Sequence, residues 1–281
     1  MRILFIGDIF GKPGRKMVNQ HLNHLIEQHK IDFVIANAEN AAHGKGITWK
    51  IYHQLKRAKI DFFTMGNHTW NKSEGLEILA QQDDIIRPIN LSEDFIHYNI
   101  GVGSKVVVVN QTRIRITNML GGSIKLINAN TKQNCVLNPF VYLEKFLIDN
   151  QDHDIHILDF HSETTSEKNA ILRAFNGKLS AILGTHTHVP TNDFQIYNHT
   201  AYITDVGMTG PFEGIIGAEV NSILAMFYQK SDRFRLDVAK GLKQLSAVVL
   251  EFDQNHQIKK FWPIILREDN LSGAVLMKKV S

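Results

Sequence analysis

The sequence contains little cysteine, no long apolar run and no strong excess of either charge. Its single cysteine, Cys135, excludes an internal disulfide framework and fits a reducing cytoplasm. No stretch approaches the roughly 18 apolar residues that can span a bilayer, so no membrane-spanning helix and no membrane partner are expected. The first apolar run is short and ends at Gly7-Asp8, which is not typical of a signal peptide.

The charge balance argues against two classes of binding surface. The formal net charge is +3, which is too small to indicate a nucleic-acid or membrane surface. Hydrophobic residues make up 43% of the chain and charged residues 21%, as in a globular protein. The sequence shows no internal repeat, low-complexity segment or linker. We therefore expect a single domain over residues 1–281.

Histidine, in contrast, is abundant, with 14 residues. It is the commonest metal ligand and a frequent acid or base. His186 and His188 lie in the segment GTHTH, which follows an apolar run, 181–183, that predicts a buried strand. In extended backbone, residues two apart point the same way, so both imidazoles are expected to face one point beyond the strand. Alone, the pair fits either half of a metal site or two polar surface residues.

Strand and helix patterns alternate through the first 80 residues. Apolar runs predict strands at 3–6, 33–36 and 62–65. Helical spacing predicts helices at 15–30, 48–59 and 73–82, with Thr48 as a helix cap and a turn at 11–14. This alternation predicts a parallel sheet with right-handed crossovers.

After residue 100 the pattern becomes mixed. A hairpin is expected across 110–112, between two β-branched runs. Helices are expected at 139–148, 165–175 and 219–229, and strands at 155–160, 181–183, 201–204, 247–252 and 258–265. The whole pattern predicts an α/β fold with two mixed sheets packed face to face and helices outside.

Five of the predicted strands are followed directly by side chains that can bind a metal: Asp8, Glu39 and Asn40, Asn67 and His68, His161, and His186 and His188. Each residue alone could equally be a cap, a turn, a loop or a core residue. Together they are expected to meet at one edge of the fold. Oxygen and nitrogen donors without thiolate favour Fe, Mn, Zn or Co. A carboxylate can bridge two such ions, and a metal pair suits phosphoryl transfer.

The order of these motifs resembles the calcineurin-like metallophosphoesterase superfamily, from residue 3 to about residue 210. Within it, the chain is similar to the YmdB-like branch. The motifs that carry the resemblance are GDIFGKPGR (7–15), NAENAAHGKGIT (37–48), GNH (66–68), DFHSETTSEK (159–168), GTHTHVPT (184–191) and TDVGMTGP (204–211). The resemblance implies a four-layer α/β/β/α sandwich.

Two departures from the superfamily pattern are typical of the YmdB-like branch. The usual Asp-x-His motif is Asp8-Ile9-Phe10 here, so one histidine ligand is missing. The usual Gly-Asp motif is replaced by Glu39-Asn40. In that branch, the amide beside the bridging glutamate supplies the missing ligand.

The resemblance implies a role for each site residue. One metal would be held by Asp8, Glu39, Asn40 and His188, and a second by Glu39, Asn67, His161 and His186. The two ions per chain would be Fe or Mn, with Zn, Co and Mg as alternatives. His68 would be the general acid. The implied activity is hydrolysis of phosphodiesters of cyclic or short nucleotides through a metal-bridging hydroxide.

Two alternatives to this activity stay open. One is a regulatory protein that binds nucleotide or RNA with little turnover, and the other is an exonuclease or phosphatase of the same superfamily. A complete site with His68 present favours catalysis, and the weak positive charge argues against long nucleic acid. His43 and Lys45 are expected either to contact a phosphate or to lie in a solvated loop, and Asp205 to have a structural role. The sequence leaves the natural substrate and a homo-oligomer open.

Overall fold

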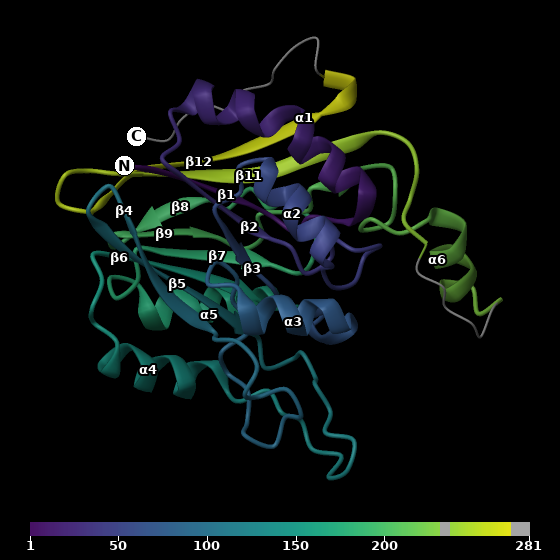
Figure 1. Cartoon of the computed structure of the whole chain (residues 1–281), viewed down its shortest axis with the longest axis horizontal. Coiled ribbons are helices and arrows are strands. Elements are labelled where there is room, and N and C mark those ends of the chain that lie inside the picture. The colour runs from purple at the N-terminus through teal and green to yellow at the C-terminus, as the bar shows by residue number, and fades with distance from the viewer. Residues whose placement is uncertain (231–236, 271–281) are drawn as a thin grey trace.

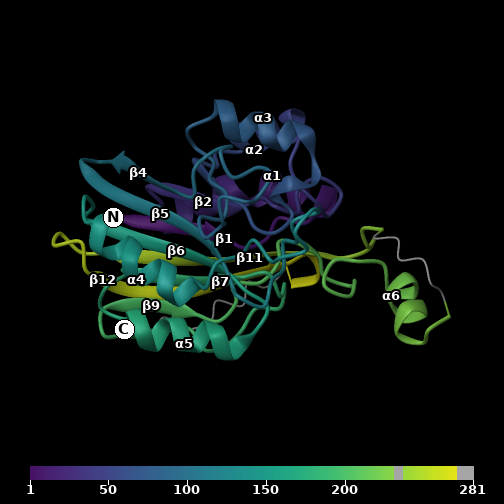
Figure 2. The same cartoon turned by 90° about the horizontal axis from the view of Figure 1, so that it is seen from below.

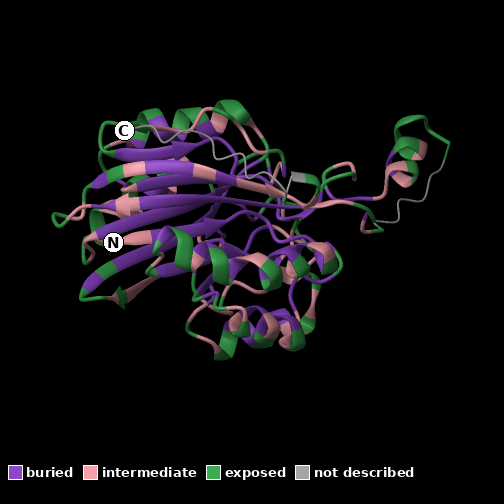
Figure 3. Cartoon of the chain, turned by 90° about the horizontal axis from the view of Figure 1, so that it is seen from above, coloured by how far each residue is buried: buried purple, intermediate pink, exposed green. Residues whose placement is uncertain are grey.

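The computed structural model describes residues 1–230 and 237–270 of the chain. Two six-stranded sheets lie face to face, and helices cover the outer face of each (Figures 1 and 2). This arrangement confirms the predicted α/β/β/α sandwich with two mixed sheets. Buried residues run along the strands of both sheets, while exposed residues gather on the outer sides of the helices (Figure 3).

The first sheet carries the parallel strands of the amino-terminal region. Its order is β10-β11-β1-β2-β3, and β12 pairs with β11. Strands β1, β2 and β3 are parallel, and β11 runs antiparallel to β1. The bounds are β1 Arg2–Ile6, β2 Phe33–Asn37, β3 Phe62–Thr64, β10 Gly210–Pro211, β11 Lys243–Phe252 and β12 Ile258–Arg267.

The second sheet has the order β4-β5-β6-β7-β9-β8. Its central strands β5, β6, β7 and β9 are parallel, and the strands at both edges are antiparallel to their neighbours. The predicted hairpin joins β4 to β5, and its turn residues Asn110 and Gln111 have φ angles of 48° and 67°. The bounds are β4 Ser104–Val109, β5 Thr112–Leu120, β6 Ile155–His161, β7 Ala181–Thr185, β8 Gln195–Tyr197 and β9 Thr200–Ile203.

The strands of the first sheet are apolar on both faces because each face packs on a different layer. Along β1, Ile3 and Phe5 join the core between the two sheets, whereas Leu4 and Ile6 pack towards the helices. This division follows from the two-residue period of a strand. A third cluster, which includes Phe160, fills the space between the second sheet and its helices.

Helices α1, α2 and α3 lie on the outer side of the first sheet, and α4 and α5 lie on that of the second (Figure 2). A short helix, α6, stands away from both sheets in the two views (Figures 1 and 2). The bounds are α1 Gly11–His29, α2 Trp49–Arg57, α3 Ser73–Gln81, α4 Pro139–Asp149, α5 Thr165–Phe175 and α6 Val220–Phe227, with 3-10 turns at Thr69–Asn71 and Glu268–Asn270. Within the described ranges, no helix is long and apolar enough to cross a membrane.

One local prediction is wrong, and a second is correct in position only. Residues 11–14 form the first turn of α1 and not a separate turn. Pro13 is compatible with that position because a helix does not use the N–H groups of its first turn. Thr48 does precede α2, but its side chain makes no capping hydrogen bond.

Candidate metal centre

The site residues come from the carboxyl ends of strands in both sheets. Asp8, Glu39, Asn40, Asn67 and His68 follow β1, β2 and β3 of the first sheet. His161 ends β6, and His186 and His188 follow β7, in the second sheet. The side chains therefore meet as expected, but at the edges of two sheets and not of one.

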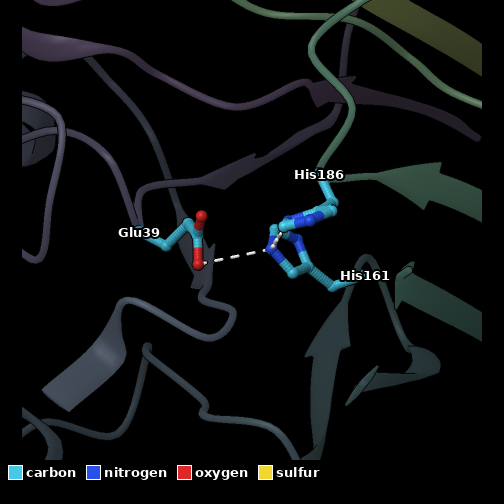
Figure 4. Close-up of side chains that lie close together, drawn as sticks. All are labelled: Glu39, His161 and His186. Atoms are coloured by element: carbon cyan, nitrogen blue, oxygen red, sulfur yellow. Dashed lines mark hydrogen bonds and ion pairs between the residues drawn. The ribbon is translucent and has the colours of Figure 1, made fainter. Parts of the chain in front are cut away.

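Glu39, His161 and His186 form the centre of the cluster (Figure 4). His161 Nε2 lies 3.3 Å from Glu39 Oε2 and 3.0 Å from His186 Nδ1. Asn67 Oδ1 lies 3.0 Å from the same nitrogen. One imidazole nitrogen cannot hydrogen-bond to a carboxylate, an amide and a second imidazole together, but these donor types suit a common metal ion. The ligand atoms of the central three residues lie within 4.8 Å of one another and could hold one.

Asn40 lies beside the other carboxylate oxygen of Glu39, His188 lies beside Asn40, and Asp8 lies close to His188. Asn40 Nδ2 donates to Glu39 Oε1 at 2.8 Å and lies 3.1 Å from His188 Nε2. Asp8 Oδ1 is buried without a hydrogen-bond partner among the described residues, 4.0 Å from His188 Nε2. A buried carboxylate oxygen without a partner is costly, and a cation at this point would satisfy it. To bind through Oδ1, the Asn40 amide would have to turn by half a rotation.

The other ring nitrogens of the histidines are held by hydrogen bonds. His188 Nδ1 donates to the carbonyl of Ile216 at 2.8 Å. His161 Nδ1 lies 2.8 Å from Thr185 Oγ1, and this hydroxyl donates to Asp159 Oδ1 at 2.6 Å. Both rings therefore turn Nε2 towards the cluster, where this atom can bind a metal ion once it has no proton. Such outer hydrogen bonds fix the tautomer and orientation of metal-binding histidines.

Two neighbouring rings have opposite pKa shifts. Burial opposes a charge on His161, but the Glu39 and Asp8 carboxylates outweigh it and raise the pKa of the ring to about 9. Burial and the adjacent His161 ring lower the pKa of His186 to about 3. Without a metal ion, His161 therefore keeps its second proton, next to the Glu39 and Asp8 carboxylates. Positive charge is favoured at the place where the nitrogen and oxygen donors converge.

Gly66, in the GNH motif, makes room for this convergence. A Cβ atom at this residue would overlap the Glu39 carboxylate and the His161 ring. The φ angle of Gly66 lies outside the left-handed region, so the close approach of side chains is the reason for glycine here. The backbone that follows β3 can therefore pass close to the two side chains.

His68 lies beside the cluster and does not join it. Its backbone N–H donates to Glu39 Oε2 at 2.9 Å, which ties this residue to the central carboxylate. Its ring Nδ1 lies 2.9 Å from Asn71 Oδ1, and the side chain lines the cavity above the cluster. From this position, the His68 ring could contact a molecule bound in the cavity.

The backbone of GTHTH differs from the prediction. His186 and His188 have φ angles of 96° and 65°, in the left-handed region, so the segment is a turn and not extended backbone. Both side chains still face the cluster, but strand alternation is not the reason. Non-glycine residues rarely adopt such angles, which cost about 1–3 kcal/mol each. Surrounding contacts must offset this cost.

A buried ion pair supplies those contacts. Asp205 Oδ2 accepts from the N–H of Thr187 at 3.1 Å and from its hydroxyl at 2.7 Å. Lys168 Nζ, on α5, donates to Asp205 Oδ2 and to the carbonyl of Thr185, both at 2.8 Å. Lys168 is 1% exposed and Asp205 is fully buried. Asp205 thus makes the structural hydrogen bonds expected of it. The sequence does not predict that Lys168 holds the same turn.

Lys168→Met is expected to lower the unfolding temperature by roughly 10 °C, because breaking a buried pair leaves an uncompensated charge that costs about 3–5 kcal/mol. The measurement is thermal unfolding of the metal-free protein, followed by metal analysis after loading. Lys145→Met, at an exposed residue of α4, is the matched control. Wild-type unfolding and wild-type metal content in Lys168→Met would contradict a role for this pair in holding the turn.

Other residues around the cluster were also missed. Asp159 lies two residues before His161 on the same strand face, and that spacing is the signal that could have revealed it. Burial raises the pKa of Asp159 to about 6. Glu163 Oε2 lies 2.9 Å from His186 Nε2. Of the two loop candidates, Lys45 lines the cavity above the cluster, and His43 lies outside its lining.

Comparisons with known proteins identify the family of the chain. The family described as YmdB-like protein matches residues 4–264. A putative phosphatase/phosphodiesterase of Mycoplasma genitalium is 46% identical over 89% of this chain and 87% of its own. A 2′,3′-cyclic-nucleotide 2′-phosphodiesterase of Bacillus subtilis is 39% identical over 96% of this chain and 99% of its own.

A solved structure has the same fold. The crystal structure of a novel phosphatase from Mycoplasma pneumoniae superposes with a TM-score of 0.89 and 41% identity, over 95% of this chain and 93% of that chain. The names of the curated relatives support the expected hydrolase class, which is thereby confirmed. On sequence and fold together, the chain belongs to the YmdB-like protein family.

Proposed function

We propose that this chain is a dinuclear metal-dependent phosphodiesterase that hydrolyses cyclic or short nucleotide phosphodiesters. The observation that carries the proposal is the position of Glu39 between two groups of donors. Its Oε1 faces Asn40 at 2.8 Å, and its Oε2 faces His161 at 3.3 Å. A carboxylate placed in this way can bridge two metal ions.

The donors on the two sides divide into two sets. Asp8, Asn40 and His188 would hold one ion together with Glu39, and Asn67, His161 and His186 would hold the other. The partnerless Asp8 oxygen supports the first set, and the three-way convergence on His161 Nε2 supports the second. Carboxylate, amide and imidazole donors without thiolate suit Fe or Mn, with Zn, Co and Mg as alternatives.

The protein residues would divide the work as follows. A bound metal pair supplies Lewis acidity for the phosphoryl oxygens and an activated water as nucleophile. Asn71 accepts a hydrogen bond from His68 Nδ1–H, so Nε2 is the atom left to carry a proton to the leaving oxygen. The hydrogen bonds that His161 and His188 donate to Thr185 and Ile216 keep the two rings oriented while substrate binds.

The relatives support the choice of substrate class. The Bacillus subtilis relative is named for a cyclic phosphodiester of a nucleotide, and it covers 96% of this chain. A small substrate also suits a cavity of about 560 Å³ above the cluster. We therefore propose a small phosphodiester as substrate and no long nucleic acid.

Elemental analysis of the purified, unchelated protein, combined with hydrolysis of bis-p-nitrophenyl phosphate in added Mn²⁺, tests this function. We expect about two metal ions per chain and diesterase activity that a chelator removes. Protein that remains without metal and without activity after Mn²⁺ or Fe²⁺ reconstitution would refute the proposal. A nucleotide-binding protein on the same fold would then be the better interpretation.

A further inference from the structure

Helix α6 presents a set of apolar side chains that the rest of the described chain does not cover. Met226 is 40% exposed and Phe227 is 71% exposed, whereas Ile223 is buried. Leu224 and Tyr228 are also exposed. Clusters of exposed apolar residues on such a short, outlying helix mark a binding surface more often than chance. Figure 3 shows α6 standing clear of the sheets.

One face of α6 forms the wall of the cavity above the metal-ligand cluster. Ile223, Met226 and Phe227 line this cavity, and their spacing of three and four residues places them on one side of the helix. Phe10, which follows β1, lines it as well. We call these four residues the apolar wall. Glu39 and His186 line the same cavity, so the wall and the proposed reaction centre share one space.

The polar residues of the cavity point to an anionic ligand. Lys45 and His68 line it together with the cluster. Within residues 1–230 and 237–270, the Lys45 ammonium has no hydrogen bond or ion pair, so its charge is available to a ligand. A molecule that fits would therefore carry negative charge beside the cluster and a flat apolar group at the wall. A nucleotide has both parts.

We propose that the apolar wall binds the nucleobase of the substrate, so that α6 selects nucleotide phosphodiesters over phosphodiesters that lack a base. This inference rests on the proposed function and names its specificity determinant. Bases stack on aromatic side chains without regard to sequence, because every base has a π-face. Leu224, in α6, and Tyr228, which directly follows the helix, lie outside the lining of the cavity.

The test compares two substrates with the same reacting group. Both 2′,3′-cyclic AMP and ribose 2,3-cyclic phosphate contain a five-membered cyclic phosphodiester, but only the first carries a base. We expect Phe227→Ala to lower kcat/KM for 2′,3′-cyclic AMP by about 10-fold or more, because stacking on one aromatic ring is worth about that factor. The value for ribose 2,3-cyclic phosphate should stay at the wild-type level.

Leu224→Ala is the matched control, since it removes an exposed apolar residue of α6 outside the cavity. It should leave both substrates unchanged. Equal loss on both substrates in Phe227→Ala, or no loss on either, would overturn the inference. Loss in Leu224→Ala together with a smaller particle in size-exclusion chromatography would show instead that α6 contacts a second copy of the chain.

A binding measurement separates this inference from the proposed function. If the wild-type protein hydrolyses neither substrate after metal loading, the proposed activity fails. Calorimetric titration with adenosine 3′-monophosphate and with ribose 3-phosphate then decides the role of the wall. Tighter binding of the nucleotide that Phe227→Ala abolishes would support base binding, and equal affinities in the wild type would exclude it.

Discussion

Glu39→Ala is expected to lose both metal ions and to reduce phosphodiesterase activity at least about 10³-fold, because the metals supply several kcal/mol of transition-state stabilisation. Glu39 is 1% exposed, and each of its oxygens faces a different group of donors. Metal content per folded chain and kcat/KM for bis-p-nitrophenyl phosphate are the quantities to measure.

The controls for Glu39 separate folding from metal binding. Glu39→Gln keeps the shape of the side chain and removes its charge, so it should lose metal while its far-ultraviolet circular dichroism matches the wild type. Glu93→Ala, at an exposed carboxylate, should change neither metal content nor rate. Two metal ions retained by either Glu39 variant would be incompatible with a bridging role.

His68→Ala is expected to keep the metals and to lower kcat by roughly 10²–10⁴-fold, the usual contribution of a general acid. The His68 ring bonds to Asn71 and lines the cavity, and its link to Glu39 is made by the backbone N–H, which alanine also provides. The loss should be greatest for a nucleotide substrate with an alkoxide leaving group. It should be small for bis-p-nitrophenyl phosphate, since p-nitrophenolate departs without protonation.

This dependence on the leaving group distinguishes general-acid catalysis from structural damage. A damaged cavity would slow both substrates alike. His24→Ala, at an exposed histidine of α1, is the matched control and should behave as the wild type. Loss of metal from His68→Ala would show that the residue is a ligand or holds one, and would contradict the assignment.

The parts of the fold that the sequence predicts well depend on local patterns. Strands such as β1 read as continuous apolar runs because both faces are covered, and the polar residue that follows each run marks the carboxyl end of the strand. The predicted helix 165–175 has the bounds of α5. The strand ends alone therefore indicate that Asp8, Glu39, His161 and their partners form one site.

The parts that the sequence does not predict depend on contacts between distant segments. The left-handed angles of His186 and His188 lie beside hydrogen bonds that Asp205 accepts from Thr187 and that Lys168 donates to Thr185, and both partners come from elsewhere in the chain. No local pattern reveals such a turn, since a histidine alone favours negative φ angles. The division of the cluster between two sheets was hidden for the same reason, because it follows from sheet order and not from strand sequence.

Both sheets contribute ligands to the cluster, and this has a consequence for how the protein can vary. Face-to-face sheets stand about 10 Å apart, a distance that the side chains between them set. Phe5 and Leu183 are among those side chains, and both are fully buried. The distance between the ligands of the first sheet and those of the second is therefore set in part by the hydrophobic core. Changes in core volume must be compensated within that layer if the same ion radius is to fit, which couples the chemistry of the site to residues that never touch the substrate.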